Sequence, residues 1–169
     1  VLRAVAPDTF IEDSLRVLRA VQLAARFEMT VEPATAELCR SIDLSDLPSE
    51  RVWGEVEKLL LLALRPSIGL RTALELDVFD KLFPELSALA REPNDPALAH
   101  TGLSLDQAAV LARELSRPER TAVMVATMCH DLGIPIAAKL VDKESIDHGE
   151  LGVEPALAVM NRLGLHTLA

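Results

Sequence analysis

Apolar residues recur at helical spacing along most of the chain, and this periodicity restricts the fold more than any other feature. The stripe from Ile11 through Leu15 and Leu18 to Met29, which the polar Gln22 interrupts, is typical of one face of an α-helix. Ala, Leu, Arg and Glu dominate the sequence, and these residues are strong helix formers. The alternation that predicts strands is missing apart from a possible short stretch at residues 29–31. The chain is therefore predicted to be all-α.

Caps and prolines divide this pattern into separate helices. Asp8 or Thr9 can cap the helix that carries the stripe, and Ser49 can cap a later helix that follows Pro48. We expect further helices at residues 33–40, 49–63 and 66–76, a short turn at 78–83, and helices at roughly 101–116, 118–131 and 147–163. Residues 91–97 combine two prolines with an Asn-Asp pair, which predicts a linker.

Composition excludes several classes of protein. The 169 residues include 17 basic and 26 acidic side chains, which gives a net charge of −9, and 50% are hydrophobic. A disordered chain would be less apolar, and a protein that coats nucleic acid broadly would be basic. The longest aliphatic run, Leu59 to Leu64, is far too short to span a membrane. Cys39 and Cys129 form neither a disulfide framework nor a CxxC zinc pattern, which favours a reducing cytoplasm.

A short segment near the start of the chain combines an acid and a base three residues apart. Asp13 and Arg16 would project from the same face of the predicted helix. Asp supplies hydrogen-bond acceptors and Arg supplies fixed donors, so the pair can bind the edge of a nucleobase. The same spacing is also typical of an ordinary ion pair at a helix N-terminus, and spacing alone favours that interpretation.

Residues 10–27 closely resemble the Glu-Asp-x-x-Arg segment of bacterial class II tRNA nucleotidyltransferases and poly(A) polymerases. In that family the segment opens the neck behind the catalytic head, and its Asp and Arg select the incoming CTP or ATP. The resemblance implies this role for Asp13 and Arg16, with Arg19 also binding the nucleotide and Glu12 supporting the motif.

Further segments fit the same family. Glu50, Arg51 and Glu55 resemble the next family motif, which supports the nucleotide-selecting helix, although charged residues at a helix start also serve as caps. Residues 82–86, Leu-Phe-Pro-Glu-Leu, match a common ending of the neck and body, and residues 1–5 resemble the last strand or turn of the head.

The catalytic centre of the family has no counterpart in the sequence. Nucleotidyl transfer needs carboxylates that hold two divalent ions, and the family places them as Asp-x-Asp after a Gly-Ser loop. Neither motif is present in this chain. We therefore expect the Mg²⁺-binding head to lie outside the chain, and the chain alone to be inactive in nucleotide addition. Ser14 replaces a usual Pro and Gln22 a common Arg, and the second change is expected to weaken a phosphate or base contact.

The second half carries histidines in a pattern of its own. An adjacent His130-Asp131 pair can offer an imidazole and a carboxylate to one divalent cation, with His100 or His148 as a further ligand. These positions resemble the HD superfamily, which is linked to metal-dependent phosphohydrolase activity, and the resemblance implies a tentative metal site at the four residues. Ile134 replaces the usual Lys, which removes an expected phosphate contact.

The motifs follow one another in family order and predict the domain organisation. We expect neck and body helices at residues 1–90, a linker at 91–97 and a truncated HD-type domain at 98–169, all within a longer enzyme because the chain starts at Val1. The leading hypothesis is the C-terminal portion of a tRNA nucleotidyltransferase that adds CMP or AMP to the 3′ end of tRNA. CCA, CC-only, A-only and poly(A) addition fit equally well.

Two other functions stay open. The chain is alternatively a metal-dependent HD phosphohydrolase or a non-catalytic helical interaction module. RNA contact is also open, because Arg113, Arg117 and Arg120 form either a local basic patch or a solvated helix face, and the general behaviour of such residues favours the solvated face. The leading hypothesis implies three partners: CTP, ATP and the 3′ end of tRNA. It implies no contact with a membrane.

Overall fold

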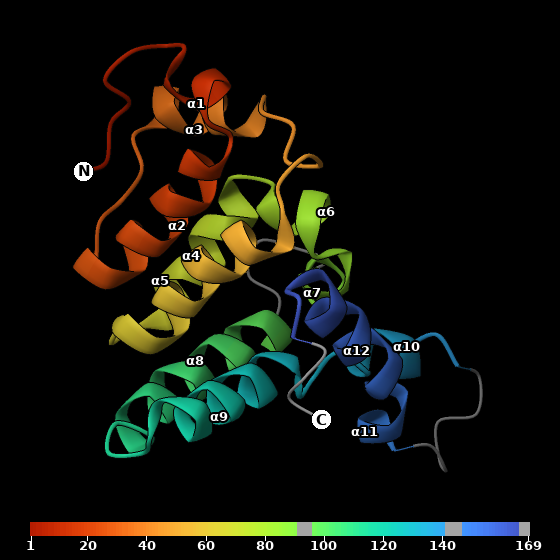
Figure 1. Ribbon diagram of the computed structural model, residues 1–169. Helices are drawn as coiled ribbons and strands as arrows, with labels where there is room; N and C mark the ends of the chain where they lie inside the picture. Colours follow the sequence, from red (N-terminus) through yellow and green to blue (C-terminus); the bar gives the residue numbers. More distant parts are fainter. Residues whose placement is uncertain (91–95, 141–146, 166–169) are drawn as a thin grey trace.

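A computed structural model describes residues 1–90, 96–140 and 147–165, and every regular element in these ranges is helical (Figure 1). The prediction of an all-α fold is confirmed. The helices are α1 (Thr9–Glu12), α2 (Leu15–Phe27), α3 (Pro33–Arg40), α4 (Ser49–Leu62), α5 (Pro66–Glu75), α6 (Val78–Leu82), α7 (Pro84–Ser87), α8 (Pro96–Leu111), α9 (Arg117–Cys129), α10 (Ile134–Ala137), α11 (His148–Leu151) and α12 (Val153–Arg162).

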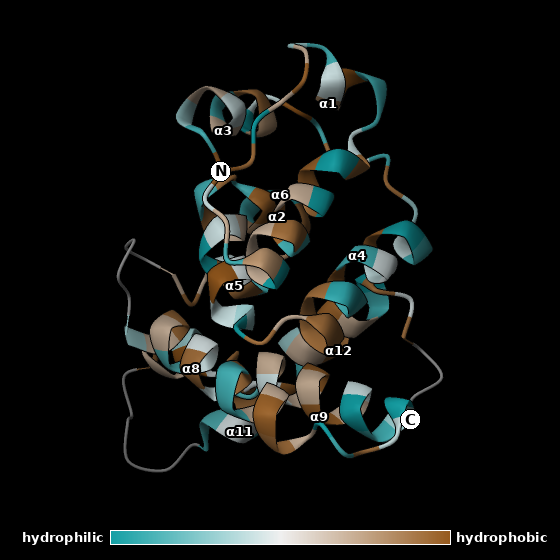
Figure 2. Cartoon of the chain, turned by 90° about the vertical axis from the view of Figure 1, so that its left-hand side faces the viewer, coloured by the Kyte–Doolittle hydropathy of each residue, from teal (hydrophilic) through white to brown (hydrophobic). Residues whose placement is uncertain are grey.

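The core forms where α2 packs against α4 and α5, and α8 and α9 then pack against α5 and α4 (Figure 1). Val17 and Leu60 are fully buried at the first of these contacts, and Leu105 and Met124 are fully buried at the second. Figure 2 shows the same helices coloured by hydropathy, with polar and apolar residues mixed along α2 and apolar residues prominent on α9. The two groups of helices share one continuous core.

The single helix expected from Thr9 to Met29 is wrong, because the chain breaks at Asp13. This residue has an extended backbone (φ −153°, ψ 101°), which ends α1 before α2 starts. The Asp13 carboxylate accepts a hydrogen bond from the Leu15 amide, and Asp side chains that bond locally in this way compete with helix formation. The break leaves Ile11, part of the predicted apolar stripe, 76% exposed.

The possible strand near residue 30 is present only as an isolated bridge. Leu2 pairs in parallel with Val31, donating its amide to the Thr30 carbonyl at 2.8 Å and accepting from the Glu32 amide at 2.9 Å. The N-terminal residues are thereby attached beside the α2–α3 connection.

Several helix boundaries differ from the sequence prediction. Ser49 is the first residue of α4 and makes no side-chain cap, because Pro48 occupies the N-cap position. The turn expected at residues 78–83 contains α6, and the helix expected at 147–163 is two helices that meet at Gly152. Residues 91–95 of the expected linker lie outside the described residues, and α8 already begins at Pro96.

Asp106 and Arg162 make polar contacts between the halves of the chain. The Asp106 carboxylate on α8 accepts from the amide and the hydroxyl of Ser67 in the first turn of α5, at 2.9 and 2.7 Å. Arg162, at the end of α12, donates to both carboxylate oxygens of Glu85 in α7 and to the Leu82 carbonyl at 3.0 Å. The Leu-Phe-Pro-Glu-Leu segment therefore holds the C-terminal helices against the first half.

Within the described ranges, no helix combines the length and the apolar character needed to cross a membrane.

Candidate functional site

The break between α1 and α2 presents Asp13 beside a polar hollow. The Asp13 Oδ1 atom accepts from the Leu15 amide at 3.2 Å and from Arg51 Nη2 at 3.0 Å. Burial acts to raise the pKa of this carboxyl. The effect of burial is outweighed by the hydrogen bonds from Arg51 and Leu15 and by the charges of Arg51 and Arg16, so the pKa lies below its ordinary value. Asp13 is thus held as an ionised acceptor at neutral pH.

Arg16 lies in the first turn of α2 and is fixed by α1. Its Nη1 atom donates to the Thr9 carbonyl at 2.7 Å and to Glu12 Oε2 at 2.9 Å. The prediction that Asp13 and Arg16 project from one helix face is therefore wrong, since Asp13 lies outside the helix. The alternative of an ordinary ion pair between them is not formed either, because Asp13 bonds to Arg51 instead. The two side chains still influence each other through their charges.

The remaining residues of the two motifs lie along α2 and α4. Glu50 is exposed in the first turn of α4. Glu55 is buried, with only 3% of its side chain exposed, and its Oε1 atom accepts from Lys58 at 2.9 Å and lies 3.7 Å from Arg19 Nη2. Its Oε2 atom has no hydrogen-bond partner within the described part of the chain. Glu55 therefore anchors two cations on the outer face of the α2–α4 pair.

The hollow beside Asp13 has a volume of about 440 Å³. It is lined by residues of α1, of the α1–α2 break, of the 41–46 loop and of α4: Phe10, Ile11, Glu12, Asp13, Ser14, Ser41, Ile42, Asp43, Asp46 and Arg51. Asp13, Glu12 and Arg51 are thus brought together here, whereas Arg16 and Arg19 lie outside the lining. The part that the 41–46 loop takes in this hollow was not predicted, since no recognisable motif marks the loop.

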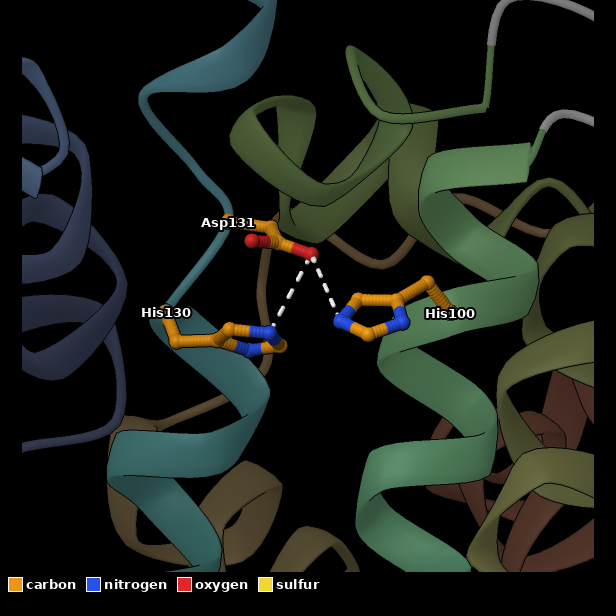
Figure 3. A group of neighbouring side chains, drawn as sticks. All are labelled: His100, His130 and Asp131. Carbon is orange, nitrogen blue, oxygen red and sulfur yellow. Dashed lines mark ion pairs between the residues drawn. The ribbon is translucent and has the colours of Figure 1, made fainter. Parts of the chain in front are cut away.

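A second cluster lies where α8 faces the end of α9. His100, on α8, and His130 and Asp131, which directly follow α9, offer ligand atoms that all lie within 4.8 Å of one another (Figure 3). Asp131 Oδ2 lies 3.2 Å from His130 Nε2 and 3.9 Å from His100 Nε2. The Asp131 carboxylate is buried, and the two rings are at the surface.

Hydrogen bonding sets the tautomer of one of these rings. His130 Nδ1 lies 2.7 Å from the Thr127 carbonyl, which can only accept, so Nδ1 carries a hydrogen. In the neutral ring, Nε2 then turns a lone pair toward Asp131 Oδ2, a buried atom without a hydrogen-bond partner within the described residues. Two acceptors in this arrangement require a proton or a cation between them. The donor set fits a divalent ion that accepts imidazole and carboxylate ligands.

His148 does not join this cluster. It starts α11, where its ring Nδ1 lies 3.8 Å from Asp147 Oδ1. Its backbone, however, explains the glycine after His-Asp-Leu, because a Cβ at Gly133 would lie 1.8 Å from the His148 carbonyl oxygen. The α11 backbone thus packs directly on the turn that presents Asp131.

Comparisons with known proteins match both halves of the chain. The family model described as the probable RNA- and SrmB-binding site of polymerase A matches residues 28–89. The multifunctional CCA protein of Pasteurella multocida (strain Pm70) is 38% identical over 179 residues, which cover 97% of this chain and 42% of that protein. The chain therefore matches a segment of the CCA-adding enzyme and poly(A) polymerase family.

Other members of the CCA-adding family show the same coverage. The multifunctional CCA protein of Mannheimia succiniciproducens is 36% identical over 180 residues, covering 98% of this chain and 42% of that protein. The chain thus spans less than half the length of these relatives. A solved structure, "The complex structure of CCA-adding enzyme with CTP", has a TM-score of 0.44 and 18% identity, and covers 96% of this chain and 48% of that one. This likeness is too low for comparing individual residues.

Proposed function

We propose that the chain is the nucleobase-selecting and RNA-holding part of a tRNA nucleotidyltransferase that adds CMP or AMP to the 3′ end of tRNA. The observation that carries this proposal is the placement of Asp13, an ionised acceptor fixed by Arg51 at the edge of a polar hollow. The carboxylates and Mg²⁺ ions that perform the transfer are assigned to a catalytic head, because the chain holds no Asp-x-Asp motif.

The chemistry of Asp13 suits the two nucleotides that such an enzyme selects. Cytosine and adenine both carry an exocyclic amino group, whereas guanine and uracil carry a carbonyl oxygen at the corresponding position. A carboxylate accepts from the amino group and repels the carbonyl oxygen. Since Oδ1 accepts from Leu15 and Arg51, we assign Oδ2 to the base. Arg16 supplies donors for the ring acceptors next to the amino group.

A nucleotide titration tests this assignment on the chain itself. We expect CTP and ATP to shift the NMR signals of Asp13 and Arg16, and expect UTP and GTP to shift them far less. The Asp13→Asn variant should lose this discrimination. Asp46→Asn is the matched control, because it changes a carboxylate of the same hollow that is exposed. Equal shifts with all four nucleotides would defeat the proposal, and no shift with any of them would favour a helical interaction module.

The cluster of His100, His130 and Asp131 supports a second candidate function, a metal-dependent phosphohydrolase activity. His100 Nε2, His130 Nε2 and Asp131 Oδ2 would hold the cation. A divalent ion in such a site polarises a phosphoryl oxygen or acidifies a bound water. The protein supplies the fixed His130 tautomer and the buried carboxylate that favours a cation.

Metal binding can be measured without any activity assay. We expect Mn²⁺ titrated into the metal-free chain to bind with one site per chain by calorimetry, and expect His130→Ala to abolish the heat. His148→Ala should bind Mn²⁺ as the unmodified chain does, since His148 lies outside the cluster. An unmodified chain that takes up no metal would rule this function out.

A further inference from the structure

One wall of the hollow beside Asp13 comes from the loop that connects α3 to α4. Ser41, Ile42 and Asp43 of this loop line the hollow together with Asp13. A loop of this kind is kept in place by the contacts that it makes with the rest of the fold. Those contacts therefore decide the shape of the hollow.

Lys81, near the end of α6, reaches across to this loop. Its Nζ atom donates to the Arg40 carbonyl at 2.6 Å and to the Ile42 carbonyl at 2.8 Å, and α6 lies beside the loop (Figure 1). Arg40 is the last residue of α3, and carbonyls at the C-terminus of a helix lack partners within the helix and attract a cation. Lys81 therefore holds the backbone on both sides of Ser41.

The helix that carries Lys81 is itself anchored in the core. Val78 and Phe79, in the first turn of α6, are both buried. On the side of the loop, Leu44 is fully buried as well. The loop is thereby held between the Lys81 ammonium, which stands on a fixed helix, and the buried Leu44 side chain.

Ile42 gives this wall of the hollow an apolar surface. Its side chain is half-buried, packs against the core and lines the hollow. The Asp13 carboxylate lines the same hollow. A nucleobase offers hydrogen-bonding groups at its edge and a flat face that packs against apolar side chains. The hollow therefore combines a partner for the edge of a base with a partner for its face.

We propose that the face of the selected nucleobase packs against Ile42, and that Lys81 is the positioning residue that keeps Ile42 in place. The inference rests on the proposed function, in which Asp13 binds the edge of that base. Asp13 distinguishes the amino group of cytosine and adenine from a carbonyl oxygen, whereas every base has a face that can pack against Ile42. Loss of the Ile42 contact should therefore weaken nucleotide binding without changing which nucleotide is selected.

Nucleotide titrations of the chain separate these two contributions. We would follow the NMR signals of Asp13 while CTP, ATP, UTP or GTP is added to the unmodified chain and to its variants. Ile42→Ala should weaken the binding of CTP and ATP by about threefold to tenfold and keep their preference over UTP and GTP. Lys81→Met should approach the same loss. Lys81→Arg should restore the affinity, because a guanidinium can donate to the same two carbonyls.

A matched control and a second measurement keep the result interpretable. Lys139→Met removes an exposed lysine that follows α10, outside the lining of the hollow, and should bind CTP like the unmodified chain. Without any nucleotide, the amide signals of residues 41–46 should shift and exchange faster with solvent in Lys81→Met but not in Lys139→Met. Circular dichroism identifies variants that lose structure. If Lys81→Met is one of them, Lys81→Gln, which keeps a neutral donor, takes its place with a smaller expected loss.

The outcomes separate this inference from the function beneath it. Unchanged affinity for CTP and ATP in Ile42→Ala would overturn the contact with the base, and unchanged affinity or unchanged loop signals in Lys81→Met would overturn the positioning role. A loss of the preference for CTP and ATP in either variant would also contradict the inference, which gives that preference to Asp13. In each of these cases, selective shifts at Asp13 in the unmodified chain would leave the proposed function standing. Absence of those shifts would refute the function and this inference together.

Discussion

Substituting Glu85 by Gln removes the negative charge from the ion pair that connects α7 to α12. Arg162 donates to both Glu85 oxygens, one of them at 2.6 Å, and also to the Leu82 carbonyl. The Glu85→Gln variant keeps one acceptor oxygen in place but turns a two-pronged ion pair into a single bond from the charged guanidinium to a neutral amide oxygen. We therefore expect the C-terminal helices to be held less tightly against the first half of the chain.

The geometry sets the size of the effect. Hydrogen bonds to charged groups contribute about 1.5–3 kcal/mol. The Arg162 side chain is 38% exposed, so solvent screening reduces the charge-dependent part, and we expect Glu85→Gln to lower the free energy of unfolding by about 1–2 kcal/mol. For a chain of this length such a loss lowers Tm by about 2–8 °C, which calorimetry or circular dichroism resolves easily.

The same pair predicts a dependence on pH. Burial acts to raise the pKa of Glu85, but its bonds with Arg162 outweigh this and place the pKa below the ordinary value of 4.5. A carboxyl with a lowered pKa stabilises the folded state fully above its unfolded pKa, and this stabilisation is lost as the pH falls through the folded pKa. The stability difference between the unmodified chain and Glu85→Gln should therefore be constant near neutral pH and shrink below about pH 4.5.

A double-mutant cycle decides whether the pair itself is responsible. Arg162→Met, Glu85→Gln and the double variant should give a coupling energy of about 1 kcal/mol. Glu114→Gln, at an exposed glutamate beyond the end of α8, serves as the control for loss of a charge. A coupling energy near zero, or a stability difference that does not change with pH, would refute this account of the contact between the halves.

Two further predictions concern backbone packing and thiol reactivity. Gly133→Ala should destabilise the chain by about 1–3 kcal/mol in urea unfolding, because the added Cβ would lie 1.8 Å from the His148 carbonyl oxygen. Gly54→Ala, whose Cβ would meet no atom within 4 Å, should instead stabilise α4 by up to about 1 kcal/mol. Equal effects of the two substitutions would contradict the packing of α11 on the turn. Burial raises the pKa of Cys39 to about 11 and that of Cys129 to about 12, so Ellman's reagent at pH 8 should label neither thiol until denaturant is added, and rapid labelling of the native chain would show that the core opens.

Local periodicity and the positions of prolines were enough to predict the helical class and most of the helices. The residues at 33–40 and 66–76 carry their own boundaries, since Pro33 and Pro66 each open a helix. The break at Asp13 was not predictable in this way. It depends partly on Arg51, a partner 38 residues away in the sequence, whose contact no local pattern reveals.

In the candidate sites, too, residue types could be predicted from the sequence, but contacts between distant residues could not. The His130-Asp131 pair and His100 were identified by residue type, and the fold brings these three together. His148 is also a histidine, but only its backbone carbonyl packs near this region, against Gly133. The Thr127 carbonyl, which fixes the His130 tautomer, is a backbone group that any residue could supply, so the sequence carries no indication of it.

Whether Asp13 selects the nucleobase can be measured in an enzyme in which the chain is joined to a catalytic head. The measurement is kcat/KM for CTP and ATP against UTP and GTP, in the unmodified enzyme and in Asp13→Ala and Arg16→Ala. We expect both variants to lose discrimination between the two pairs of nucleotides, and expect Asp46→Ala to keep it. Unchanged selection of CTP and ATP in Asp13→Ala and Arg16→Ala would contradict this expectation.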